Sequence, residues 1–182
     1  MSRIAIPASA EAAPEASRPL LAQVKSLLGS VPNLFRLVAH SPAALEGYLG
    51  LFGALGKGRL PAATRERIAL AIAEFNGCGY CLSAHSYLAA NLAKLPPEEI
   101  AANRRGRSAD PKANAAVVFA LKVAEARGHV SDADLHAVRD AGFGDAEVIE
   151  IVQNVALNIW TNYVNEVART EIDFPVADGA AA

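Results

Sequence analysis

The chain has 182 residues, which is long enough for one domain with a full hydrophobic core. Its formal net charge is -2 and its lysine and arginine residues are scattered, which argues against nucleic acid as a partner. No apolar run reaches the ~18 residues needed to span a bilayer, and Pro7 and Glu11 interrupt the N-terminal segment, so we expect a cytoplasmic protein without membrane contact.

The chain divides into an arm, a helical domain and a tail. Residues 1–17 are rich in alanine, proline and serine and have no periodicity, so we expect an extended arm. Residues 18–172 carry apolar side chains at helical spacing between turn signals and are expected to form a single domain. Residues 173–182 are expected to form a loose tail. Since no alternating strand pattern of useful length is present, we predict an all-α fold.

Several of the expected helices begin with a recognisable signal. Ser41 and Asp110 each precede a proline, a combination typical of an N-cap followed by the first helical residue. Asn33 is a further N-cap candidate, and Ser131 with Asp134 resembles a capping box. The expected helices cover residues 18–28, 34–38, 43–55, 61–75, 78–94, a short stretch from 97, 111–127, 132–141 and 145–170.

The last of these helices differs from the others in its apolar content. Residues 145–170 are apolar around most of the helix circumference. A helix of this kind is buried in the core or at a contact between subunits. We therefore expect it to be central, and we expect the protein to form a homo-oligomer.

Residues 78–85, Cys-Gly-Tyr-Cys-Leu-Ser-Ala-His, contain both cysteines of the chain and one of its four histidines. Asn76-Gly77 is a break signal, so a helix is expected to open here. Residues three and four apart share a helix face, so Cys78, Cys81 and His85 would project from one side. In a first helical turn the macrodipole favours a thiolate. A thiol with a pKa near 8.5 is only ~3% ionised at pH 7, whereas a pKa of about 7 makes it roughly half ionised.

Three other interpretations of the two cysteines were weighed. A structural disulfide would close a very short loop and stabilise the fold by only ~2 kcal/mol. A zinc site would need four ligands, and the chain offers no second CxxC and no HxxxH to complete it. Two unrelated buried cysteines would not explain the CxxC spacing with a histidine one turn later. Redox chemistry is the favoured interpretation.

The residues near the dithiol suggest roles for each group. Cys81 is the better-placed nucleophile because the imidazole of His85, one turn later, can accept its proton, and Cys78 would then resolve the sulfenic acid. The opposite assignment stays open, since the N-terminal cysteine attacks in thioredoxin-like motifs. Glu66 and Glu74, on the preceding helix, are the carboxylates that could fold back to the site. His40, His129 and His136 are interpreted as ordinary surface histidines.

Glu66 followed by Cys78-x-x-Cys81-x-x-x-His85 resembles the pattern of the alkylhydroperoxidase D (AhpD)-like branch of the carboxymuconolactone decarboxylase family. The flanking segments 31–35, 41–43, 65–70 and 161–163 resemble the peroxidase-related members of that branch. The resemblance covers roughly residues 18–175.

The resemblance implies an all-helical fold, assembly into trimers or hexamers, and no metal or organic cofactor. It also implies that Cys81 reacts with a hydroperoxide, that Cys78 closes the disulfide, and that Glu66 and His85 form a proton relay. A dithiol protein would then reduce the disulfide. One position departs from the best-known pattern, because Tyr80 occurs where that pattern has a histidine. Tyrosine does not shuttle protons near neutral pH as histidine does.

Three functions are therefore compared: a thiol peroxidase, a protein disulfide oxidoreductase that acts on a partner protein, and a non-enzymatic helical oligomer with a structural or metal-binding CxxC.

Overall fold

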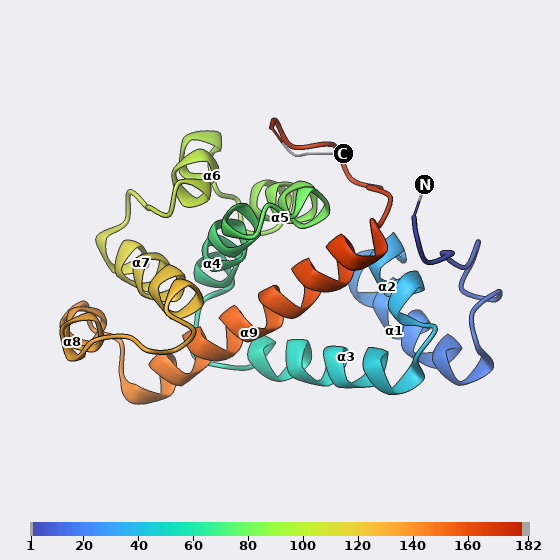
Figure 1. Ribbon diagram of the computed structural model, residues 1–182, viewed down its shortest axis with the longest axis horizontal. Coiled ribbons are helices and arrows are strands. Elements are labelled where there is room, and N and C mark those ends of the chain that lie inside the picture. The colour runs from blue at the N-terminus through green and yellow to red at the C-terminus, as the bar shows by residue number, and fades with distance from the viewer. Residues whose placement is uncertain (1, 180–182) are drawn as a thin grey trace.

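The computed structural model describes residues 2–179, and every regular element among them is a helix (Figure 1). The all-α prediction is confirmed. The elements are a 3-10 turn at Glu15–Ser17 followed by α1 (Arg18–Leu28), α2 (Asn33–Val38), α3 (Pro42–Gly56), α4 (Ala62–Phe75), α5 (Gly79–Asn91), α6 (Pro97–Arg104), α7 (Pro111–Glu125), α8 (Asp132–Asp140) and α9 (Asp145–Ala168).

The start signals explain where several helices begin. Ser41 and Asp110 cap α3 and α7 by accepting a backbone N–H three residues later, and Ser131 and Asp134 form the predicted capping box of α8. The prediction for Asn33 was wrong. Its side chain donates to the carbonyl of Glu171 at 2.8 Å instead, and Asn33 is the first residue of α2. The Asn33 side chain therefore binds the distant C-terminal segment and does not cap the helix.

Helix α4 is the centre of the domain, and it packs against α5, α6, α7 and α9. Its fully buried residues Ile68 and Ile72 pack into one apolar cluster, and Leu70 packs into another. Alanines fill the intervening positions, which lets the neighbouring helices approach closely. Helix α4 therefore packs closely against all four of these helices.

Helix α9 crosses the molecule, with α3 on one side and α4 and α5 on the other (Figure 1). This agrees with the expectation that it is central. Its inner face buries Ile151 and Val155, together with several asparagines. Its outer face exposes Ile149, Val152, Trp160, Tyr163 and Val167. Whether this outer face contacts another subunit stays a prediction, as does the expected homo-oligomer.

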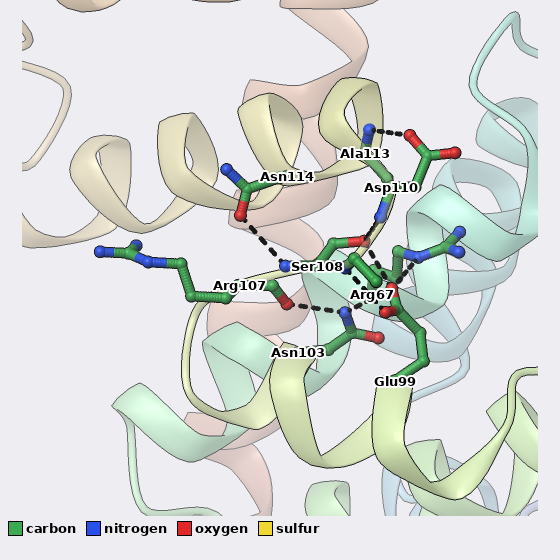
Figure 2. Close-up of polar contacts among 9 residues, drawn as sticks. Arg67, Glu99, Asn103, Arg107, Ser108, Asp110, Ala113 and Asn114 are labelled. Atoms are coloured by element: carbon green, nitrogen blue, oxygen red, sulfur yellow. Dashed lines mark hydrogen bonds and ion pairs between the residues drawn. The ribbon is translucent and has the colours of Figure 1, made fainter.

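A buried carboxylate fixes the connection between α6 and α7 to α4 (Figure 2). Glu99 on α6 is 5% exposed and accepts from Arg67 Nε at 2.7 Å, from the Ala109 backbone N–H at 2.9 Å and from Ser108 Oγ. Burial alone would raise the pKa of Glu99, but these hydrogen bonds outweigh it and lower the pKa to about 2. The network secures α4 at the residue that follows Glu66.

The described parts of the arm and of the tail both lie against the helical domain. In the arm, the Arg3 backbone N–H donates to the carbonyl of Ala168, and Arg36 donates to the carbonyl of Pro7. In the tail, the backbone N–H of Ala177 donates to Ser83 Oγ on α5 at 3.1 Å. Residues 180–182 of the predicted loose tail lie outside the described residues. None of the described helices combines the length and the apolar character needed to cross a bilayer.

Candidate active site

The chain passes from α4 into α5 through residues 76–78, where the break was predicted. Gly77 has a φ of 66°, in the left-handed region that favours glycine. The backbone N–H of Cys78 then donates to the carbonyl of Ala73 at 2.9 Å and closes the end of α4. Helix α5 begins one residue later than predicted: Cys78 is its N-cap rather than its first residue, and Cys81 lies in its first turn.

The two sulfurs face each other at the start of α5. The backbone N–H of Cys81 donates to Cys78 Sγ at 3.4 Å, so the first cysteine caps the helix with its own sulfur. Both residues are free thiols, and they are 0% and 3% exposed. The arrangement is a buried dithiol in its reduced state.

The surroundings shift the pKa values of the two thiols in opposite directions. A hydrogen bond from Cys78 lowers the pKa of Cys81 to about 7, with further lowering by the charge of His85 and a hydrogen bond from Asn165, although burial opposes the shift. The same hydrogen bond and burial raise the pKa of Cys78. The surroundings therefore favour ionisation of Cys81 over ionisation of Cys78.

The imidazole of His85 is oriented by Glu66. His85 Nδ1 lies 2.9 Å from Glu66 Oε2, and each side chain is 21% exposed. Burial alone would lower the pKa of His85, but the negative charge of Glu66 and its hydrogen bond raise it. Since Nδ1 is engaged by the carboxylate, Nε2 is the ring nitrogen that can exchange a proton with another group.

A cavity of about 100 Å³ lies beside these groups, and Cys81, His85 and Glu66 line it. Cys78 does not line it. The opposite wall is apolar and includes Tyr48 and Phe52 of α3, two residues that sequence reasoning did not single out. A cavity of this size holds several waters or a small organic group. The thiol with the lowered pKa is thus the one that faces the cavity.

The position before Cys81 is occupied by a structural tyrosine. The Tyr80 hydroxyl accepts the backbone N–H of Leu34 at 3.1 Å and donates to Asp173 Oδ1 at 2.9 Å. Burial raises the pKa of Tyr80, as does the charge of Asp173. The other oxygen of Asp173 accepts the backbone N–H of Asn33 at 2.8 Å. The phenol therefore joins α5 to α2 and to the C-terminal segment and carries no proton for the dithiol.

Two carboxylates were candidates for the site, and only one reaches it. Glu74 instead pairs with Arg104 of α6 at 2.6 Å, near the C-terminal end of α4. Among the histidines outside the dithiol segment, His40 contacts the carbonyl of Ala5 in the N-terminal arm. Within residues 2–179 no cluster of three or more histidine, cysteine, aspartate or glutamate side chains has the geometry of a metal site.

Sequence reasoning also missed Asn165. This side chain of α9 is 2% exposed, and its Nδ2 donates to Cys81 Sγ at 3.2 Å. A signal was present, because asparagines recur at residues 154, 158, 162 and 165 of an otherwise apolar helix. Asparagines at this spacing lie on one helix face, and all four are buried.

Comparison with known proteins finds one matching family and several structures of similar fold. The model of the carboxymuconolactone decarboxylase family matches residues 42–126, which include the dithiol, His85 and Glu66. No curated protein matches the chain significantly.

Three solved structures illustrate the likeness in fold. A peroxidase-related protein with an alkylhydroperoxidase AhpD core from Ralstonia eutropha JMP134 is 28% identical, over 94% of this chain and 92% of that chain, with a TM-score of 0.84. A peroxidase-related protein from Silicibacter sp. TM1040 is 24% identical, over 87% and 85% of the two chains, with a TM-score of 0.77. The debrominase Bmp8, in complex with 2,3,4-tribromopyrrole, is 20% identical over 92% and 90%, with a TM-score of 0.78.

The family match across the dithiol segment and the likeness, at 28% identity, to a protein with an alkylhydroperoxidase AhpD core both support placing the chain in the AhpD-like branch of the carboxymuconolactone decarboxylase family.

Proposed function

We propose that this AhpD-type enzyme is a thiol-dependent peroxidase that reduces small hydroperoxides at Cys81. The observation that carries the proposal is the position of the ionisable sulfur. Cys81 has the lowered pKa, it lines the cavity, and the pair His85–Glu66 lines the same cavity. A protonated His85 beside the thiolate is a proton source for a leaving oxygen.

In the first step the Cys81 thiolate attacks the terminal oxygen of a hydroperoxide. The O–O bond breaks, an S–O bond forms, and the released alkoxide takes a proton from His85 to become an alcohol. Cys81 is oxidised to the sulfenic acid and the peroxide is reduced. Glu66 supports the charge of His85 before this transfer and directs the ring while the proton leaves.

In the second step Cys78 resolves the sulfenic acid. Its sulfur attacks Cys81 Sγ, the S–O bond breaks, and hydroxide leaves as water with the proton that Cys78 gives up. An external dithiol, which we take to be a protein, then reduces the disulfide to two thiols and becomes a disulfide itself. The pair needs little rearrangement, since the two residues already contact each other at the start of α5.

The cavity also limits the substrate. Its volume of about 100 Å³ is smaller than the ~150 Å³ cavity that accommodates benzene. The size favours hydrogen peroxide and compact organic hydroperoxides over those with long chains or substituted rings.

The test compares peroxide consumption by the wild type, Cys81→Ser and Cys78→Ser with dithiothreitol as reductant and tert-butyl hydroperoxide as substrate. We expect Cys81→Ser to be inactive, and Cys78→Ser to accumulate a sulfenic acid that dimedone traps on Cys81. His136→Ala serves as a surface control. Equal rates for the wild type and Cys81→Ser would refute the proposal.

The disulfide oxidoreductase alternative predicts a different result. In that alternative a partner protein is the substrate and forms a mixed disulfide with one sulfur, whereas in the peroxidase a protein only reduces the disulfide after peroxide has reacted. Trapping of a mixed disulfide with a substrate protein by Cys81→Ser or Cys78→Ser, without peroxide turnover by the wild type, would favour it. Stoichiometric zinc in the purified protein would favour the non-enzymatic alternative.

A further inference from the structure

Asn165 of α9 contacts the reacting sulfur directly, and we infer that it is a catalytic residue that holds Cys81 as the thiolate. The inference deepens the thiol chemistry proposed above, on which it rests. It adds a group that favours the ionised form of one of the two neighbouring sulfurs. The supporting contact is the 3.2 Å distance between Asn165 Nδ2 and Cys81 Sγ.

The contact favours the anion over the neutral thiol. A carboxamide N–H is a donor, and an ionised sulfur accepts a hydrogen bond far better than a thiol does. Since Asn165 and Cys81 are 2% and 3% exposed, water does not compete for the bond. Among residues 2–179, no side chain of this kind donates to Cys78, whose sulfur accepts the backbone N–H of Cys81 at 3.4 Å. The two sulfurs therefore differ in their donors as well as in their positions.

Asn165 is not placed for stability. Its Oδ1 is buried and has no hydrogen-bond partner among the described residues. An unpaired buried acceptor is destabilising, and in native proteins such groups call for an explanation in function or stored strain. The orientation that leaves Oδ1 unpaired is the one that directs Nδ2 at Cys81. Among the described residues, the contact with Cys81 Sγ is the hydrogen bond that the Asn165 side chain makes.

Asn162 supplies a second donor on the same face. It lies one turn before Asn165 on α9 and is 0% exposed. Its Oδ1 accepts from Asn76 Nδ2 at 2.8 Å, which fixes the orientation of the carboxamide. Its Nδ2 is buried and makes no hydrogen bond to another described residue. When Cys81 loses its proton, this N–H is the next donor that the sulfur can engage.

The test measures the ionisation of Cys81 in the intact protein. Alkylation by iodoacetamide is followed between pH 5 and pH 10, and mass spectrometry of the peptides reports modification at Cys81. In Asn165→Leu we expect the midpoint to rise by about one pH unit, so that alkylation at pH 7 slows by about five-fold while the rate at pH 10 is unchanged. Asn154→Leu removes an equally buried carboxamide of α9 that contacts no cysteine, and its midpoint should match the wild type.

A second variant guards against a loss of fold. Asn165→Asp keeps the size of the side chain and replaces the donor with an acceptor, so its midpoint should also rise. A midpoint that stays the same or falls in both variants would overturn the inference. A fall would mean that Asn165 accepts a hydrogen bond from the thiol instead.

The result is separable from the test of the peroxidase. If the wild type does not consume peroxide but the midpoint still rises in Asn165→Leu, the substrate is wrong and the role of Asn165 stands. If peroxide is consumed and the midpoint does not move, the peroxidase stands and the role of Asn165 falls.

Discussion

His85 Nδ1 lies 2.9 Å from Glu66 Oε2, and this contact joins the helix that carries the dithiol to the central helix of the domain. The carboxylate determines which nitrogen of the imidazole faces the cavity. It also supports the positive charge that His85 presents to Cys81. The contact therefore couples the ionisation of one residue to that of another.

Replacing Glu66 with glutamine should uncouple the two groups. Glu66→Gln keeps the side-chain shape but removes the negative charge, so the pKa of His85 should fall and the pKa of Cys81 should rise. We expect kcat/KM for tert-butyl hydroperoxide to fall on the order of 100-fold, as when a positioned acid–base group is lost. Glu74→Gln, which alters an ion pair with Arg104 of α6, is the matched control and should retain activity. Equal losses in both variants would contradict the assignment.

The pH dependence of the first step should have two limbs. The rate rises as pH increases through about 7, because Cys81 ionises there. It falls again as pH passes the raised pKa of His85, since the proton for the leaving alkoxide is then lost. Stopped-flow measurement of a single turnover across this range tests both limbs. In Glu66→Gln the alkaline limb should move to lower pH, and an unmoved limb would show that His85 is not the proton source.

Removing the hydroxyl of Tyr80 should release the C-terminal segment. Tyr80→Phe leaves the Leu34 backbone N–H and the Asp173 carboxylate without a shared partner, and should destabilise the fold by about 1 to 3 kcal/mol. Urea unfolding measures the loss, and hydrogen exchange should be faster around Ala177. Tyr163→Phe alters an exposed phenol of α9 and should change neither measurement. A stable Tyr80→Phe variant with an unchanged C-terminal segment would refute this role.

The buried carboxylate of Glu99 should contribute stability that depends on pH. Its folded-state pKa of about 2 lies below the usual glutamate pKa of 4.5, so the contribution is present above about pH 4.5 and is lost as pH falls toward 2. Glu99→Gln should reduce the free energy of unfolding at pH 7 on the order of 2 kcal/mol. Urea unfolding at pH 7 and pH 3 tests the expectation that the difference between variant and wild type narrows in acid. Glu98→Gln, on the first turn of the same helix, is the control.

Enlarging the cavity should change substrate preference. Phe52 lines the cavity and is 43% exposed, so Phe52→Ala opens the apolar wall. We expect the ratio of kcat/KM for cumene hydroperoxide to that for hydrogen peroxide to rise on the order of ten-fold. Phe75→Ala removes an exposed ring outside the cavity and should leave the ratio unchanged. A ratio unaffected by Phe52→Ala would mean that the substrate reaches Cys81 by another route.

The sequence by itself determined the features that depend on neighbouring residues. Turn and cap signals located the helices, because a helix start is decided within a few residues by groups such as Ser41 and Asp110. The CxxC spacing placed Cys78, Cys81 and His85 together at the start of one helix for the same reason. Asn33 was misassigned because its partner, Glu171, lies far along the chain.

Only the tertiary structure decided how the two sulfurs differ and what surrounds them. Cys81 faces the cavity and accepts from Asn165, a residue 84 positions away on α9. Tyr80 holds the C-terminal segment against α2 and α5, because its hydroxyl makes hydrogen bonds to Leu34 and to Asp173. Such relationships depend on how separate helices pack, and packing brings together residues whose spacing in the chain has no period. Burial then sets the strength of each contact, because the same hydrogen bond shifts an ionisation more strongly where water is excluded.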